Sequence, residues 1–122
     1  MSMNPIKAEK LLNFPNDVSY KARMSLDTIV RIENTLGSSI LKVGNKLASG
    51  DLTLTEIISI LTLCIRAGGN DLKDNDVKAL VAEVGLIESI KMTGEMIGLA
   101  LNPSQELDPK SESNSEQKKN QT

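Results

Sequence analysis

The segment from Leu54 to Ile65 constrains the fold more than any other part of the chain, because it is almost wholly apolar. A helix that is apolar around most of its surface must be covered on most of its sides. The rest of the chain is therefore expected to surround this segment, which predicts a central helix with one solvent-exposed edge. The polar residues of that edge recur four, three and four residues apart: Thr55, Ser59, Thr62 and Arg66.

Both ends of the central segment carry residues that begin or end helices. Thr53 is followed by Glu56, and in such a capping box each side chain accepts a hydrogen bond from the backbone N–H of the other residue. Gly68 and Gly69 provide the stop at the other end. They do not form a phosphate loop, because the Lys and the Ser or Thr of that motif are missing. The sequence predicts a helix from about 54 to 67.

The N-terminal part of the chain has the pattern of a β-hairpin. Residues 18–24 alternate apolar and polar side chains without exception, which is the period of a half-buried strand. Pro15-Asn16-Asp17 precedes them and has turn chemistry, because Pro fixes φ and Asn and Asp tolerate left-handed backbone. A lone hairpin is marginally stable in water, so its apolar face is expected to pack on the helices.

Four further helices are expected from apolar residues at helical spacing and from the cap residues that flank them. Together with the hairpin and the central helix, they predict an α+β fold. It consists of an N-terminal β-hairpin followed by a compact bundle of four to five short helices. The flanking residues are Ser25 and Gly37, Ser38 or Ser39 and Gly50, Asp74 or Asn75 and Gly85, and finally Leu86 and Leu101 before Pro103.

The composition changes at Pro103. Residues 103–122 contain one large apolar residue, Leu107, among Pro, Ser, Glu, Lys, Asn and Gln. Such a segment cannot bury enough apolar surface to offset the entropy lost on ordering. We therefore expect a single α+β domain over residues 1–102 and a disordered polar tail over residues 103–122.

The composition also excludes several kinds of functional site. The chain has no His and one Cys, Cys64, so it can build neither a Cys–His zinc site nor a His-dependent catalytic triad. One Phe and one Tyr are too few for a base-stacking sheet, and a net charge of −2 does not attract a polyphosphate. We expect a protein that is not an enzyme, has no metal or cofactor, and binds no small-molecule substrate and no nucleic acid.

The expected location is the cytoplasm. The N-terminus lacks the apolar core of a secretory signal. The longest apolar stretch is far shorter than the ~20 residues of a membrane span, so no membrane contact is expected. The lone Cys64 lies within that apolar stretch and is expected to be reduced and buried.

The last predicted helix carries more apolar surface than a bundle of this size needs. One apolar face begins with Leu86 and Ile87, and Met92, Met96 and Leu99 form a second group. Two interpretations remain open: both groups belong to the core, or the second is a binding surface. Methionine adapts to varied surfaces, which favours a partner site. The hypothesis is that Met92, Met96 and Leu99 bind a partner.

Several short stretches follow one another in a characteristic order. They are MSLDTIVRIENTLG with Glu33 near its end, Ser49-Gly50, Arg66-Ala67-Gly68-Gly69, Asp76-Val77 and Val84-Gly85-Leu86. In their order and spacing, residues from about 18 to 101 resemble the small tail-assembly proteins of siphophages and gene transfer agents. These are called tail-assembly chaperones in some cases and tail proteins in others. The chain departs from the family in its hairpin, where Phe14-Pro15-Asn16-Asp17 stands in place of a Gly-containing turn.

The resemblance implies a role in the assembly of a phage or prophage-derived particle. Such chaperones coat the aggregation-prone tape-measure protein in the host cytoplasm and pass it to the polymerising tail tube. On this reading Met92, Met96 and Leu99 bind the tape-measure protein or a neighbouring copy in a homo-oligomer. The tail tube protein is a further candidate partner. Two alternatives are a structural head–tail adaptor or minor tail protein that stays in the particle, and a small DNA-binding regulator.

Overall fold

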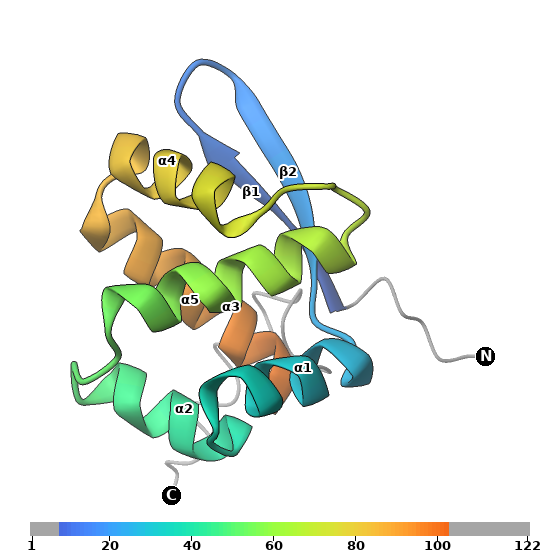
Figure 1. Ribbon diagram of the computed structural model, residues 1–122, viewed down its shortest axis with the longest axis vertical. Coiled ribbons are helices and arrows are strands. Elements are labelled where there is room, and N and C mark those ends of the chain that lie inside the picture. The colour runs from blue at the N-terminus through green and yellow to red at the C-terminus, as the bar shows by residue number, and fades with distance from the viewer. Residues whose placement is uncertain (1–7, 103–122) are drawn as a thin grey trace, which may run out of the picture.

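The structure is a computed structural model that describes residues 8–102 (Figure 1). It confirms the expected α+β class, with an N-terminal hairpin and then five helices. The tail predicted over residues 103–122 lies outside the described residues. No helix within residues 8–102 is long and apolar enough to cross a membrane. The elements are β1 (Glu9–Phe14), β2 (Val18–Arg23), α1 (Leu26–Leu36), α2 (Ile40–Ala48), α3 (Leu54–Ala67), α4 (Asp74–Val84) and α5 (Leu86–Leu101).

The hairpin forms where the alternating pattern and the turn residues predict it. Strands β1 and β2 pair antiparallel with Leu12 opposite Tyr20. The turn places Asn16 and Asp17 in left-handed backbone, at φ 66° and 61°, which these residue types tolerate. Leu12 and Phe14 are buried, and the Phe14 ring packs edge to face on Tyr20 at 6.1 Å. One face of the hairpin therefore closes the core.

The starts of α1, α2 and α3 follow from local cap chemistry, whereas α4 and α5 begin after Lys73 and Gly85, which provide no side-chain cap. Ser25 Oγ accepts a hydrogen bond from the Thr28 backbone N–H at 3.2 Å, which begins α1. The capping box of α3 is complete, since Thr53 and Glu56 each accept from the other's N–H, at 3.1 and 2.9 Å. The carboxylate of Glu33 accepts from the N–H of Ile40 at 2.9 Å. Glu33, one of the residues that carry the family resemblance, therefore ties the end of α1 to the start of α2.

Helix α3 lies at the centre, as the sequence predicts. It packs against β2, α1, α4 and α5, and in Figure 1 it crosses the middle of the molecule with the hairpin above and α1 and α2 below. The prediction of a solvent-exposed edge is wrong for Thr62, which is buried and donates its hydroxyl hydrogen to the Ile58 carbonyl at 2.7 Å. This local bond satisfies the hydroxyl, so Thr62 can face neighbouring elements.

The end of α3 is fastened to β2 by backbone contact. A Cβ at Gly68 would overlap the carbonyl oxygen of Lys21. The same carbonyl accepts a hydrogen bond from Nδ2 of Asn70 at 2.9 Å. Gly69 has the positive φ, 101°, that ends the helix, whereas Gly68 is required for the close approach. The two glycines of the predicted stop thus have different roles.

Candidate interaction surfaces

The structure places all three residues of the predicted binding site in the core. Met92, Met96 and Leu99 are 4%, 0% and 4% exposed. The physical reason is that α5 packs against α2, α3, α4 and β1, which cover these three residues, whereas Leu86 and Ile87 of the other apolar group are exposed. The expected free apolar surface is therefore absent at these residues. Partner binding by them stays a prediction, and it would require the core to open.

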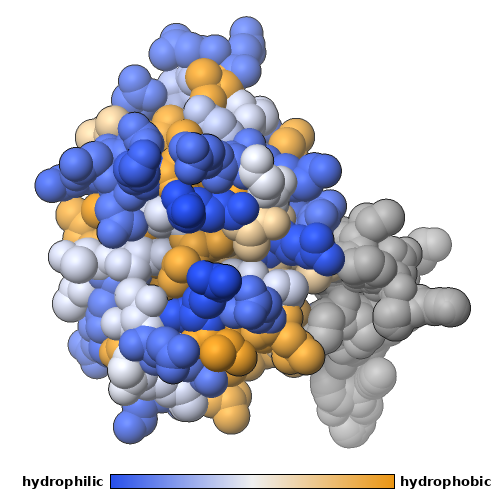
Figure 2. Space-filling model, turned by 45° about the vertical axis from the view of Figure 1, so that its right-hand side comes forward, coloured by the Kyte–Doolittle hydropathy of each residue, from blue (hydrophilic) through white to orange (hydrophobic). Residues whose placement is uncertain are grey.

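Exposed apolar side chains lie on several elements, including β1, α3 and α5, and three of them lie on the peripheral helices α1 and α2. Leu26 and Val30 on α1 are 79% and 51% exposed, and Leu41 on α2 is 63% exposed. We call Leu26, Val30 and Leu41 the outer apolar residues. In Figure 2, apolar atoms (orange) reach the surface between hydrophilic atoms (blue) in the lower part of the molecule, where α1 and α2 lie in Figure 1.

The sequence indicates the exposed position of Leu26 and Val30 on α1. At 3.6 residues per turn, Leu26 and Val30 lie roughly a third of a turn around α1 from Ile32 and Leu36. Ile32 is fully buried and Leu36 is partly buried. The apolar residues of α1 therefore form two groups, and only one of them faces α3.

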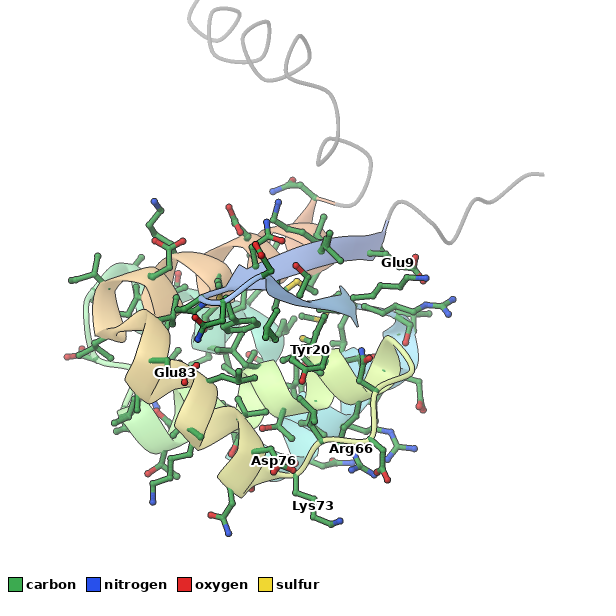
Figure 3. The ribbon with its side chains drawn as sticks, turned by 90° about the horizontal axis from the view of Figure 1, so that it is seen from above. Glu9, Tyr20, Arg66, Lys73, Asp76 and Glu83 are labelled. Atoms are coloured by element: carbon green, nitrogen blue, oxygen red, sulfur yellow. The ribbon has the colours of Figure 1, made fainter. Side chains whose placement is uncertain are left out.

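A second surface feature is a hollow of about 470 Å³ between the start of α1 and the end of α3. Three arginines line it: Arg23 at the end of β2, Arg31 on α1 and Arg66 on α3. A smaller hollow of about 310 Å³ shares Arg66 and continues to Lys73. Figure 3 shows Arg66 and Lys73 on the same side of the molecule. We call Arg23, Arg31 and Arg66 with the space between them the arginine hollow.

Two of these arginines have partners. Arg31 Nε contacts Asp27 Oδ2 at 3.0 Å. Arg66 donates to the Leu72 carbonyl at 3.0 Å, and its distance to Asp71 Oδ1 is 3.5 Å. Within residues 8–102, the buried Nε of Arg23 has no hydrogen-bond acceptor. The composition gave no sign of this cluster, because Arg66 is distant in the sequence from Arg23 and Arg31.

The titratable groups with clear pKa shifts belong to the scaffold. The Thr53 backbone N–H and then Lys46, whose Nζ is 2.9 Å away, hold the pKa of Glu56 below its usual range. Burial raises the pKa of the Cys64 thiol to about 12, so this thiol stays protonated and unreactive. The part of the chain that the structure describes contains no group of three or more His, Cys, Asp or Glu placed to hold a metal ion.

The comparison with known families finds a match. The family described as "Phage tail tube protein, GTA-gp10" matches residues 13–102, well over half of the chain. No curated protein and no solved structure shows significant similarity to the chain. The match supports the resemblance to phage and gene transfer agent tail proteins, but its description does not name a chaperone. The chain therefore belongs to the phage tail tube protein family GTA-gp10, and its role is in the structure or assembly of a phage tail.

Proposed function

We propose that the chain is a tail-assembly chaperone that binds the tape-measure protein through its outer apolar residues. The family match supports a role in the structure or assembly of a phage tail. The observation that carries the proposal is the exposure of Leu26, Val30 and Leu41 on helices that bury few residues of their own. The activity involves no catalysis and takes place in the host cytoplasm during particle assembly.

The energetics fit an assembly factor. A large aliphatic side chain contributes about 1.5–3 kcal/mol when it is fully buried, so a partner that covers these residues gains affinity. The fold leaves this contribution unused, because Leu26 and Leu41 are mostly exposed. Charged neighbours such as Asp27 and Lys42 interrupt the apolar residues. The free protein can therefore stay dispersed until it meets an apolar partner.

The test is co-expression with the tape-measure protein encoded in the same gene cluster, followed by light scattering on the soluble fraction. The wild-type chain should keep the tape-measure protein soluble and co-purify with it in many copies. The triple variant Leu26→Ser, Val30→Ser, Leu41→Ser should fold normally but leave the partner insoluble. The matched control changes three exposed apolar residues elsewhere, Leu11→Ser, Leu54→Ser and Ile87→Ser. Equal loss in both variants would contradict the assignment of the surface.

A second candidate function is a structural subunit that remains in the tail. The description of the matched family as a tail tube protein favours it. Mass spectrometry of purified particles separates the two functions, since a tube subunit is abundant in particles and a chaperone is scarce or missing. The same measurement detects a head–tail adaptor or minor tail protein as a few copies per particle. The family match favours these tail roles over a DNA-binding regulator.

A further inference from the structure

The arginine hollow has an imbalance of charge. Three guanidinium groups line it, and Asp27 is the one acidic residue among its lining residues within the described chain. Asp27 pairs with Arg31 at 3.0 Å. Arg23 makes no ion pair within residues 8–102, and the chain as a whole carries a net charge of −2. A local excess of positive charge on a slightly acidic protein favours an anion at this place.

Arg23 is held in place before any ligand arrives. It is the last residue of β2, where its Cα pairs with that of Glu9, and Ser25 begins α1 two residues later. Its Nε is buried without an acceptor among residues 8–102. A buried donor without a partner is unfavourable, and an acceptor that reaches it removes that cost. The guanidinium fork matches the two oxygens of a carboxylate.

The geometry points to a carboxylate site: the arginine hollow binds an Asp or Glu side chain of a partner protein. Arg23 makes the direct contact, while Arg31 and Arg66, which are paired with Asp27 and Asp71, line the sides of the hollow. The hollow of about 470 Å³ is large enough for such a side chain. Leu26 lies on the same turn of α1 as Asp27, so an acidic residue beside an apolar one in the partner fits this region. The inference is independent of whether the chain is a chaperone or a tube subunit.

The experiment follows the Nε–Hε resonance of Arg23 by NMR in the full chain. The probe is the blocked peptide acetyl-Gly-Glu-Gly-amide, and the control probe replaces Glu with Gln. The Arg23 resonance should shift and saturate with the Glu peptide and stay in place with the Gln peptide. Equal shifts with both peptides, or no shift with either, would overturn the carboxylate site.

Variants identify the contact. Arg23→Gln should weaken binding of the Glu peptide about tenfold or more, as expected for a lost charged hydrogen bond. Arg66→Gln should weaken it less, and Lys42→Gln, an exposed cation on α2, should leave it unchanged. Circular dichroism checks that each variant is folded. Full affinity in Arg23→Gln, or a loss in Lys42→Gln as large as in Arg23→Gln, would show that general charge attraction rather than the hollow binds the peptide.

The chain also carries carboxylates of its own beyond the described residues. The full-length variant Glu106→Gln, Asp108→Asn, Glu112→Gln, Glu116→Gln tests them as an alternative source. If the hollow is open to a partner, the Arg23 resonance of this variant matches that of the wild type in the absence of peptide. A shift of that resonance on neutralising the four residues would show that the chain occupies its own hollow, which would overturn the partner as the source.

Discussion

The inner helices α3 and α5 and the outer helices α1 and α2 use their apolar residues differently. Helix α3 buries seven side chains and α5 buries six, whereas α1 buries two and α2 buries one. All four helices carry apolar residues at helical spacing. The difference comes from how many neighbours each helix has, since α3 and α5 are each covered by several elements. Apolar content therefore does not distinguish core from surface in a bundle this small.

The strongest test of this comparison truncates one leucine on the inner helix α3 and one on the outer helix α2. Leu61 of α3 is fully buried, and Leu61→Ala should lower the free energy of unfolding by about 2–5 kcal/mol, because it leaves a cavity. Leu41→Ala on α2 should change it by no more than about 0.5 kcal/mol. Urea denaturation of both variants measures this difference. A similar loss in both would mean that the outer helices are as tightly packed as the inner ones.

The second test compares the same substitution at two glycines. Gly68→Ala places a Cβ against the Lys21 carbonyl, and the required backbone shift should cost about 1–3 kcal/mol. Gly98→Ala in α5 meets open space and should stabilise the protein by about 0.5–1 kcal/mol, because Ala favours a helix. Thermal unfolding should therefore move the two melting temperatures in opposite directions. If Gly68→Ala is neutral, the contact between α3 and β2 is looser than described.

A smaller effect is expected at the helix caps. Thr53→Ala removes one half of the capping box of α3 and should cost about 1 kcal/mol. Ser39→Ala removes the hydroxyl that accepts from the Lys42 N–H at 3.1 Å and should cost a similar amount. Hydrogen exchange separates the two variants. Faster exchange confined to α2 is expected for Ser39→Ala, while Thr53→Ala should affect the central helix and the elements packed on it.

The smallest effect is a dependence of stability on pH. The pKa of Glu56 is lowered in the folded protein, so its carboxylate stabilises the fold above the unfolded pKa. That contribution is lost as the pH falls through the folded pKa, which lies below the ordinary value of 4.5. Glu56→Gln should therefore be less stable than the wild type at pH 7, and the difference should shrink at pH 3. A difference that grows on acidification would contradict this sign.

Local chemistry made much of the fold predictable. The caps at Ser25 and Thr53 and the turn at Asn16 and Asp17 depend on residues within three or four positions of one another. The burial of Met96 was not predictable in the same way, because it depends on which elements cover α5. The sequence shows how apolar a helix is but not how many neighbours it has.

The candidate sites depend on contacts across the chain and were therefore missed. Arg23 and Arg66 meet because the end of β2 lies beside the end of α3, a contact that Gly68 permits. Nothing in the spacing of the three arginines predicts the hollow. The exposure of Leu26 could have been inferred from its angular position on α1, but only once the direction of α3 was known.

The contact of Asn70 with Lys21 has a consequence for the borders of the hairpin. The backbone N–H of Met24 donates to the Ala8 carbonyl at 2.8 Å, so Met24 and Ala8 form a hydrogen-bonded pair. Hydrogen-bonded and non-hydrogen-bonded pairs alternate along antiparallel strands, so Lys21 and Leu11 form a non-hydrogen-bonded pair. The Lys21 carbonyl therefore points away from β1, where Asn70 holds it and Gly68 covers it. The β2 border of the sheet is blocked at Lys21, while Glu9, Leu11 and Asn13 direct their backbone groups toward the β1 border. A strand that joins this sheet beside β2 would have to displace Asn70 and Gly68 from Lys21, so sheet extension is favoured beside β1.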